Sequence, residues 1–386
     1  MTLATLADRL IPAALAEDAE LPLDTSDPQL DTPAVLIDLD AVEANITRFA
    51  QLSARNGLTL RPHAKTHKSV AMARRQLAAG AVGIAVSSVT EALAFVAGGV
   101  SDILIAYPLV GRRKLDRVVS LLTGGAAVTL VSDSAAVTEG YHEIAAAAAR
   151  PLPVLVEVDT GMHRVGAEPH DVIDLAVQLA RDPLLSFGGI LTHAGDSHDA
   201  PDEPGIQEVA RREALIMGSV RADLEKHGLE VPVVSAGSTI TAPYLSATDG
   251  ITELRPGTYI YNDLRTLQCH ACTPDAIAPR ALATVISVNG ARVTIDAGSK
   301  TLTTSTIPGY GQGRLRNRPR GTFTRLSEEH GVLGLADDGP VPGVGDRVEV
   351  LPVHACVWMD LQPEVYGVRG NQVVERIAVD AMRHSL

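Results

Sequence analysis

Side chains suited to covalent chemistry follow a short apolar run near the start of this 386-residue chain. Leu60 is followed by Arg-Pro-His-Ala-Lys-Thr-His-Lys at 61–68, so that Lys65 stands two residues after His63. A lysine in a desolvated pocket of mixed charge can form a Schiff base with a carbonyl compound. An ordinary basic loop is the alternative interpretation. The segment makes Lys65 a candidate nucleophile.

Polar residues also follow three later apolar runs. They read Asp-Thr-Gly-Met-His-Arg at 159–164, Thr-His-Ala-Gly-Asp-Ser at 192–197 and Ser-Ala-Gly-Ser-Thr at 235–239. Small residues in the last segment would let backbone N–H groups approach an anion such as phosphate. In the second segment His193 is a candidate catalytic base, or a histidine that only completes the end of a strand.

Two possible metal ligands stand near the C-terminus, in His-Ala-Cys at 354–356. On an extended strand the residues i and i+2 point to one face, so His354 and Cys356 can converge on one ion. Imidazole with thiolate suits Zn²⁺, and two protein ligands leave positions for water or substrate. The alternative is a buried pair without metal. Cys269 and Cys272 form a single CxxC, which we interpret as part of a loop because no second pair accompanies it.

The apolar runs alternate with helical patterns over most of the chain, which predicts a parallel sheet buried on both faces. About eight such units favour a (β/α)8 barrel over a doubly wound sheet, and the active site would then lie at the C-terminal ends of the strands. The predicted strands lie at 34–38, 58–60, 82–86, 103–105, 128–131, 154–158, 189–192, 231–234 and 257–260.

The pattern changes near Ile277. An apolar alternating run at 282–288 turns at Asn289-Gly290 into 292–296, which predicts a β-hairpin. Later runs are strand-like too, and the sequence predicts an antiparallel β domain. The expected domains are a segment at 1–30 that packs on the β domain, a barrel at 31–274, and the β domain at 275–386 with the metal pair.

Composition limits the partners. Lys and Arg number 33 against 46 Asp and Glu, a net charge of −13, which argues against nucleic acid and anionic membranes. No apolar run is long enough to span a bilayer, the first 30 residues are unlike a signal peptide, and three cysteines are too few for a disulfide framework. We expect a globular cytoplasmic protein.

Taken in order, the motifs resemble those of the D-threonine aldolase/D-serine dehydratase family, which includes D-threo-3-hydroxyaspartate dehydratase. These are pyridoxal phosphate (PLP) enzymes of fold-type III, related to alanine racemase. The resemblance runs from Asp-Thr-Pro-Ala at 31–34 to His-Ala-Cys at 354–356. It rests on the segments at 61–68, 159–164, 191–195, 237–239, 255–259 and 329–331. It implies an alanine racemase-like barrel followed by a β domain.

The resemblance also implies a role for individual residues. Lys65 would carry PLP, Arg164 would lie near the phenolate oxygen, and Arg255 would face the pyridine nitrogen. Because arginine stays charged, it would leave that nitrogen unprotonated and weaken the electron sink. His354 and Cys356 would hold zinc, manganese or magnesium. The remaining cofactor contacts, mostly to phosphate, would come from His63, Gly237, Ser238, Thr239, Gly257, Thr258 and Tyr259.

The implied substrate is a D-β-hydroxy-α-amino acid. In dehydration Lys65 would take the Cα proton, giving a keto acid and ammonia; in aldol cleavage His193 would take the hydroxyl proton, giving glycine and an aldehyde. His-x-Cys favours dehydration, since the aldolases carry His-x-Asp, although some dehydratases have tyrosine where this chain has Leu191.

Two other interpretations fit less of the sequence. An amino-acid racemase would leave His-Ala-Cys without a purpose, and a non-catalytic PLP-binding protein would not need the β domain. Glu329 and His330 would bind the substrate carboxylate or simply form a turn. The resemblance implies a homodimer.

Overall fold

The computed structural model describes residues 14–15, 19–335 and 340–385. The chain divides into two compact units. The barrel unit comprises Glu43–Ile260, Thr266–Pro274 and the C-terminal residues from Arg383. The β unit comprises the described residues up to Val42, together with Tyr261–Arg265 and Asp275–Met382.

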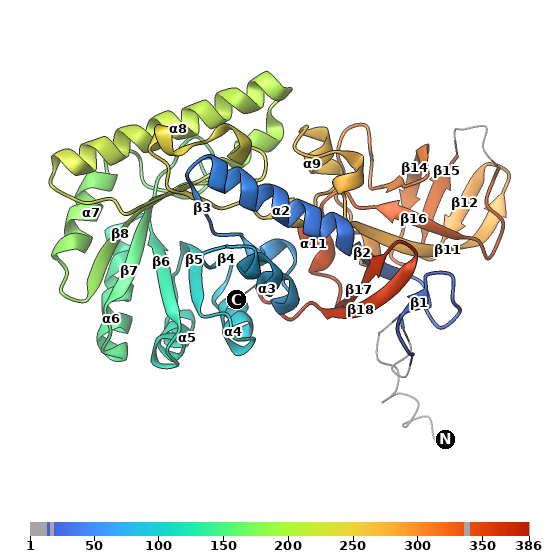
Figure 1. Ribbon diagram of the computed structural model, residues 1–386, viewed down its shortest axis with the longest axis horizontal. Coiled ribbons are helices and arrows are strands. Elements are labelled where there is room, and N and C mark those ends of the chain that lie inside the picture. Colours follow the sequence, from blue (N-terminus) through green and yellow to red (C-terminus); the bar gives the residue numbers. More distant parts are fainter. Residues whose placement is uncertain (1–13, 16–18, 336–339, 386) are drawn as a thin grey trace. The chain divides into compact units, whose positions relative to one another are not determined.

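The barrel unit contains eight parallel strands that pair in chain order, with β3 next to β10. Figure 1 shows β4 to β8 side by side. The ring closes between β3 and β4, where Val82 N–H donates to Leu60 O at 2.9 Å and Ala85 N–H donates to Pro62 O at 2.8 Å. This confirms the predicted TIM-like barrel. The strands are β3 (Thr59–Leu60), β4 (Ile84–Val86), β5 (Asp102–Pro108), β6 (Ala127–Ser132), β7 (Leu152–Glu157), β8 (Leu185–Leu191), β9 (Val233–Ala236) and β10 (Glu253–Leu254).

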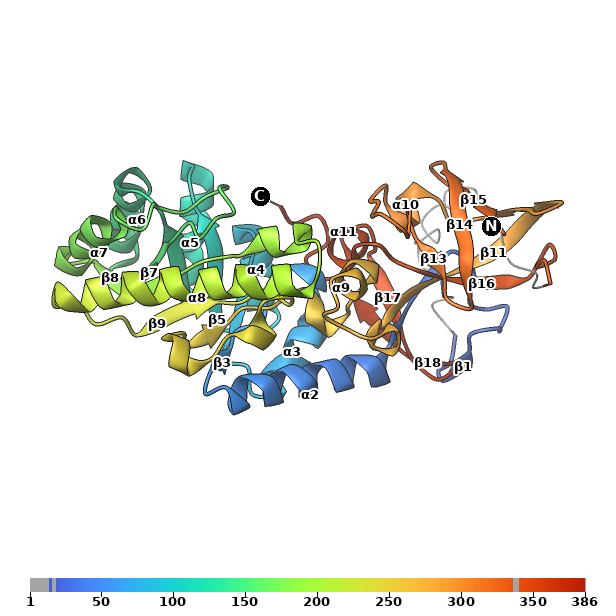
Figure 2. The same cartoon turned by 90° about the horizontal axis from the view of Figure 1, so that it is seen from above.

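Helices cover the outside of these strands, and apolar side chains fill the inside. Helix α8 packs on β8 and β9 (Figure 2). One interior cluster takes a residue from each of five strands: Ala85, Leu104, Val131, Leu155 and Leu191. The barrel is therefore a packed core, and its strand ends remain for chemistry. The helices are α2 (Leu39–Arg55), α3 (Val70–Ala78), α4 (Val89–Ala97), α5 (Arg112–Thr123), α6 (Ala135–Ala148), α7 (Val172–Arg181) and α8 (Glu203–Lys226).

The β unit contains a ten-stranded, mainly antiparallel sheet in the order β1-β18-β17-β2-β11-β12-β15-β14-β13-β16. The predicted hairpin at Asn289-Gly290 is present between β11 and β12. The strands are β1 (Leu23–Asp24), β2 (Ala34–Asp38), β11 (Pro279–Asn289), β12 (Arg292–Ile295), β13 (Arg314–Leu315), β14 (Arg318–Leu326), β15 (Gly331–Gly334), β16 (Arg347–Leu351), β17 (Glu364–Arg369) and β18 (Gln372–Ala378).

One predicted strand joins the other sheet, and one predicted strand is absent. Ala34–Asp38, predicted in the barrel, is β2 and pairs with β11 and β17 of the other sheet. A run buried on both faces looks the same in either sheet, so its sequence does not say which one it joins. The predicted strand at 257–260 is instead a 3₁₀ helix, η5 (Thr258–Ile260), and the last barrel strand is the two-residue β10.

The described part of the N-terminal segment packs within the β unit. Leu15, Leu23 and Leu30 share one apolar cluster with Leu282 of β11. Leu15 N–H also donates to the hydroxyl of Tyr366 at 3.0 Å. The segment therefore completes the core on one side of this sheet.

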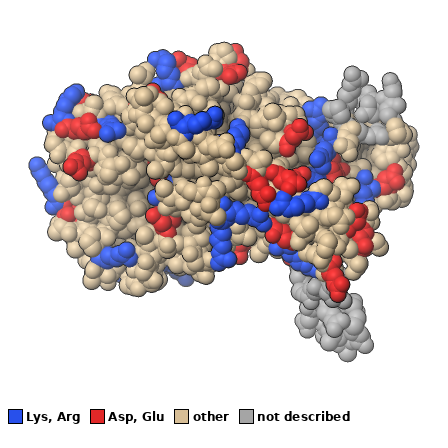
Figure 3. All heavy atoms as spheres, viewed as in Figure 1, with Lys and Arg blue, Asp and Glu red and all other residues tan. Residues whose placement is uncertain are grey.

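The surface carries charges of both signs. On the face in Figure 3, blue Lys and Arg side chains are interspersed with red Asp and Glu. Within the described residues, none of the helices has the length and apolarity needed to cross a bilayer.

Candidate active site and metal pair

The sequence-predicted residues of the barrel unit lie where its strands end. Lys65 belongs to a short 3₁₀ turn, η1 (Ala64–Thr66), that follows β3. His193 follows β8, Gly237 follows β9, and Arg255 follows β10. Because parallel strands end at one edge, these loops meet at the C-terminal mouth of the barrel.

The neutral side chain of His67 holds the Lys65 loop in place through two hydrogen bonds. His67 Nδ1 accepts the N–H of Ser69 at 3.1 Å, so Nε2 carries the hydrogen and donates to Gln76 Oε1 at 3.1 Å. Gln76 in turn donates to the hydroxyl of Tyr259 at 2.9 Å. Burial lowers the pKa of His67 to about 4. His67 is therefore a fixed hydrogen-bonding group and does not change charge near neutral pH.

A buried ion pair anchors the other end of the loop. Lys68 has a left-handed backbone, with φ of 49°, and its ammonium lies 3.2 Å from the carboxylate of Glu91. Both side chains are almost completely buried, and Glu91 also accepts the N–H of Ser87 at 2.7 Å. A fully paired buried charge of this kind resists movement, because losing one partner is costly.

Lys65 shares the mouth with two imidazoles and two guanidinium groups. Burial, followed by the charges of Lys65 and Arg255, holds the pKa of His63 well below its usual range. His193 has a pKa that is lowered in the same way by burial and then by Lys65, Arg255 and Arg164. Both imidazoles are neutral at pH 7, and the burial and positive charges that lower the pKa of each also make it a weaker base. The structure thus brings together five predicted residues.

Arg255 is held by groups at the ends of β8 and β9. Its guanidinium donates to Thr192 O at 2.5 Å and to Ser235 Oγ at 2.7 Å. Ser235 Oγ in turn donates to Glu253 at 2.6 Å, and Glu253 pairs with Arg61 at 2.9 Å. Burial lowers the pKa of Arg255, and nearby carboxylates oppose that shift. The network holds a charged donor in one orientation.

The Gly237 loop is a tight turn built around small residues. Gly237 has φ of +80°, and a Cβ there would lie 2.8 Å from Leu254 Cδ2. Its N–H donates to Glu213 Oε1 at 2.9 Å, and the N–H of Ser238 donates to Thr241 Oγ1 at 2.9 Å. These two N–H groups have acceptors within the chain. The hydroxyl oxygens of Ser238 and Thr239 accept backbone N–H groups too, so a hydroxyl group of the loop would meet a phosphate as a donor.

The Gly257–Thr258 turn packs against the other two loops. A Cβ at Gly257 would lie 3.1 Å from Thr66 Oγ1 and 3.3 Å from His63 O. The N–H of Tyr259 donates to Thr239 Oγ1 at 3.0 Å. The ring of Tyr259 lies in the core, 4.4 Å from the ring of Phe49 between centroids. Any contact of Tyr259 with a cofactor therefore comes from its backbone, because its side chain points elsewhere.

The sequence reasoning missed several buried carboxylates, two of which have a raised pKa. Glu157, the last residue of β7, lines a small cavity with Arg164, Thr192 and His193. Its Oε2 is buried with no hydrogen-bond partner among the described residues, and burial raises its pKa to about 7. Glu213 of α8 is also fully buried, and burial raises its pKa. A charged residue that ends an apolar run, as in Val-Leu-Val-Glu-Val, is a signal that could have found Glu157.

The metal pair does not lie on a strand as predicted. His354 is the N-terminal cap of a short helix, α11 (Ala355–Met359), and Cys356 lies in its first turn. The cap residue has extended dihedral angles, and the two side chains still meet in a hydrogen bond. Burial opposes it, but that bond and the charges of Cys356 and Asp263 raise the pKa of His354.

The donor set fits a soft or borderline metal ion. Thiolate with imidazole suits Zn²⁺, and the hydrogen bond between the two side chains places both groups around one point. Among the described residues, there is no group of three or more His, Cys, Asp or Glu side chains that could hold a metal ion by itself. The pair would therefore be an open site, completed by water or substrate.

The remaining candidates lie in turns and loops. Glu329 pairs with Lys300 at 2.5 Å on the surface, and Ser327 N–H donates to His330 O at 2.8 Å in the turn between β14 and β15. Both residues thus belong to an exposed turn. Cys269 and Cys272 follow the short helix α9 (Leu264–Gln268) in a loop, and none of the three cysteines, all of them described, forms a disulfide.

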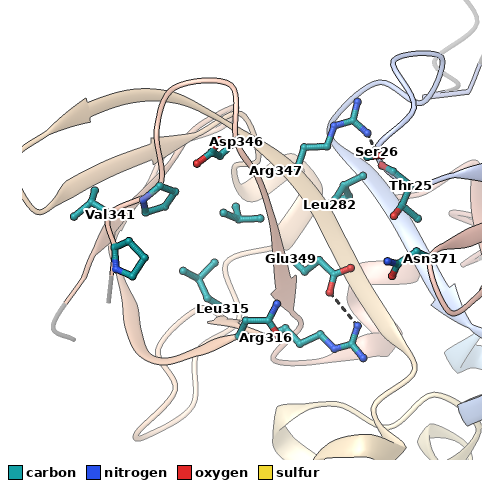
Figure 4. A pocket seen from close by; sticks show the side chains of 14 residues that line it. Thr25, Ser26, Leu282, Leu315, Arg316, Val341, Asp346, Arg347, Glu349 and Asn371 are labelled. Atoms are coloured by element: carbon teal, nitrogen blue, oxygen red, sulfur yellow. Dashed lines mark hydrogen bonds and ion pairs between the residues drawn. The ribbon is translucent and has the colours of Figure 1, made fainter. Parts of the chain in front are cut away.

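The β unit also contains a cavity of about 630 Å³ between β16, the N-terminal segment and residues 340–342 (Figure 4). Its charged side chains serve the fold. Arg316 pairs with Glu349 at 3.0 Å, and Arg347 donates to Thr25 O at 2.5 Å and Leu30 O at 2.7 Å. No sequence-predicted site residue lines it.

Comparison with known proteins identifies the families and relatives that the chain matches. The alanine racemase N-terminal domain family matches residues 37–264, and a serine dehydratase domain matches residues 278–368. The D-threo-3-hydroxyaspartate dehydratase of Delftia sp. (strain HT23) is 35% identical over 85% of this chain and 91% of that protein. The D-threonine aldolase of Arthrobacter sp. is 33% identical over 92% of this chain and 94% of that protein.

The structure has close counterparts among solved ones. A mutant D-threo-3-hydroxyaspartate dehydratase in its metal-free form superposes with a TM-score of 0.85 at 32% identity, over 92% of this chain and 98% of that chain. The likeness therefore spans both units.

Proposed function

The chain belongs to the family of PLP-dependent lyases that includes D-threo-3-hydroxyaspartate dehydratase and D-threonine aldolase, and on this premise we propose that it dehydrates D-β-hydroxy-α-amino acids to a keto acid and ammonia. The observation that carries dehydration is the hydrogen-bonded pair of His354 and Cys356. A thiolate in the second position is the dehydratase pattern of the resemblance, whereas the aldolases carry a carboxylate there.

The barrel residues fit PLP. Lys65 is fixed between His63 and the buried Lys68–Glu91 pair, and Arg164, Arg255 and the Gly237 loop surround the same mouth. PLP, when bound, supplies an electron sink for the bond that breaks at Cα. Around it, Lys65 would take the Cα proton and Arg255 would donate to the pyridine nitrogen. The hydroxyl groups of Ser238, Thr239 and Thr258 would hold the phosphate.

His354 and Cys356 would hold a divalent metal ion, zinc, manganese or magnesium. Such an ion acts as a Lewis acid toward an oxygen ligand and would make the substrate β-hydroxyl a better leaving group. Arg255 cannot easily protonate the pyridine nitrogen, so PLP would be a weaker electron sink. Lewis-acid activation of the β-hydroxyl by the metal ion would compensate for this.

The test is product analysis. Holoenzyme with added Mn²⁺ or Zn²⁺ is incubated with D-serine, D-threonine and D-threo-3-hydroxyaspartate, and the products are separated. Ammonia with a keto acid supports the proposal. Glycine with an aldehyde would overturn it in favour of the aldolase, for which the neutral His193 offers an acceptor for the hydroxyl proton. Inversion at Cα alone would indicate a racemase.

We also propose a cytoplasmic homodimer that acts on a small D-amino acid without nucleic acid or membrane partners. The family resemblance supports the dimer, and the net charge of −13 argues against nucleic acid and anionic membranes. Three cysteines are too few for a disulfide framework, which favours the cytoplasm. Sedimentation velocity and cell fractionation test it, and a monomer or a membrane-bound pool would contradict it.

A further inference from the structure

Asp263 is a buried carboxylate beside the metal pair that none of the roles above uses. It stands just before α9, with only 1% of its side chain exposed. The next two residues run alongside the segment that leads to His354. Leu264 N–H donates to Pro352 O at 3.0 Å, and Arg265 N–H donates to Val353 O at 3.3 Å.

The carboxylate faces His354 and the start of α11. Asp263 Oδ2 accepts the N–H of Ala355 at 2.9 Å and lies 3.8 Å from Nδ1 of His354. That nitrogen is buried and has no hydrogen-bond partner among the described residues. The hydrogen bond between the imidazole and Cys356 must then use the other nitrogen, Nε2. One edge of the ring faces a carboxylate, and the opposite edge faces the thiol.

This is the arrangement that orients metal-binding histidines in proteins. A ligating imidazole commonly directs its other nitrogen to a carboxylate, which fixes the ring and raises its basicity. We propose that Asp263 is the positioning residue of the metal site, holding His354 so that Nε2 points to the ion bound with Cys356. The inference rests on the proposed metal pair and adds the residue that makes it competent.

The carboxylate has a second task that a test must separate from the first. By accepting the N–H of Ala355 it also caps α11. Asp263→Asn keeps an oxygen acceptor for that N–H and removes the charge that faces His354, whereas Asp263→Ala removes both. Asp296 is a matched control in the same unit, because it accepts the N–H of Thr284 at 2.8 Å and the hydroxyl of Thr32 at 2.5 Å.

Zn²⁺ affinity of the PLP-loaded protein is measured by competition with a chelator. We expect Asp263→Asn to bind Zn²⁺ about 10- to 100-fold more weakly than wild type, and Asp296→Asn to bind as wild type does. With Co²⁺ in place of Zn²⁺, the thiolate charge-transfer band should persist in Asp263→Asn at saturating Co²⁺ and vanish in Cys356→Ala. A merely unfolded α11 would lose that band.

The outcomes separate this inference from the proposed metal site. Wild-type Zn²⁺ affinity in Asp263→Asn, alongside lost affinity in His354→Ala and Cys356→Ala, would overturn the positioning role alone. Equal affinity in wild type, His354→Ala and Cys356→Ala would overturn the metal site itself and this inference with it.

Discussion

Single buried carboxylates shape both candidate sites. Glu157 lies near Arg164 and Arg255 in the barrel mouth, and Asp263 faces His354 in the β unit. Each carboxylate lies beside side chains that the cofactor or metal would contact. Each would therefore influence the reaction by orienting or polarising those side chains. Carboxylates in such surroundings keep their influence because little water screens them.

Lys65→Ala should abolish both activity and the visible absorbance of bound PLP. The lysine is the only group proposed to bond the cofactor covalently, and removing it leaves noncovalent contacts alone. Absorbance after removal of unbound PLP measures this directly. Lys226→Ala, which alters an exposed lysine of α8, is the control and should keep the band. A retained band in Lys65→Ala would contradict the assignment.

Glu157→Gln should flatten the dependence of stability on pH. Burial raises the pKa of Glu157 to about 7 in the fold, against an ordinary 4.5. Between these values the folded chain holds a proton that the unfolded chain has released, so the free energy of unfolding falls as pH rises. The difference is worth at most about 3 kcal/mol.

Chemical denaturation of the PLP-free protein at pH 5 and pH 8 measures that fall. It should be smaller in Glu157→Gln than in wild type, and unchanged in Glu143→Gln, whose side chain is exposed on α6. An equal fall in Glu157→Gln and wild type would show that this carboxyl does not titrate in the range.

At the residue scale, the sequence predicted the groups that follow apolar runs and missed those defined by distant contacts. Lys65 and His193 stand out because polar residues directly follow strand-like runs. Asp263 accepts a hydrogen bond from a residue 92 positions away, and no local sequence pattern predicts a contact between residues so far apart. Tyr259 lies within a recognised motif, but packing against Phe49, which the motif does not contain, turns its side chain into the core.

Short loops after strands, rather than the strands themselves, determine the geometry of the mouth. The Lys65 loop, the Gly237 loop and η5 interlock through the contacts of Gly257 and the bond from Tyr259 N–H to Thr239. A change in one loop is therefore expected to reach the others. Helix α8 joins them, because its Glu213 accepts the N–H of Gly237.

Gly237→Ala should weaken PLP binding and lower the free energy of unfolding by about 1–3 kcal/mol, the cost of a non-glycine residue in a sparsely populated backbone region. The added Cβ would also meet Leu254 at 2.8 Å, which moves the loop. Equilibrium dialysis of PLP and denaturant unfolding measure the two effects.

Gly250→Ala is the matched control for that change. Gly250 has nearly the same φ, +81°, but nothing lies within 3.8 Å of the added Cβ. It should show the backbone cost and keep wild-type PLP affinity. Equal PLP affinity in both variants would mean that the Gly237 loop does not hold the cofactor.

Hydrophobic periodicity predicted which segments are strands or helices, but it did not predict which sheet each strand joins. The barrel was predictable because strands and helices alternate, and even the two-residue β3 was predicted, whereas the two-residue β10 was missed. The strand argument for His354 and Cys356 failed since the convergence comes from an extended cap followed by a helical turn. Two arrangements of the backbone can bring i and i+2 side chains together, and the sequence does not distinguish them.

Across the whole molecule, the two candidate ligand sites fall in different compact units. The groups around Lys65 belong to the barrel unit, and the metal pair with Asp263 belongs to the β unit. A ligand that binds only the folded state stabilises it by about 2.7 kcal/mol at a hundred times its Kd, and protects the segments that must open for it to leave. PLP and metal should therefore leave separate signatures.

Amide hydrogen exchange with each ligand added alone is the measurement. PLP should slow exchange in residues 61–69, 235–241 and 255–260, where the loops of the mouth bond one another. Zn²⁺ should slow exchange in residues 261–265 and 352–359, because Asp263, His354 and Cys356 tie these two segments together. Cys356→Ala should lose the second effect and keep the first. Protection by Zn²⁺ that left 352–359 unchanged would place the metal elsewhere, and with it the chemistry that favours dehydration over aldol cleavage.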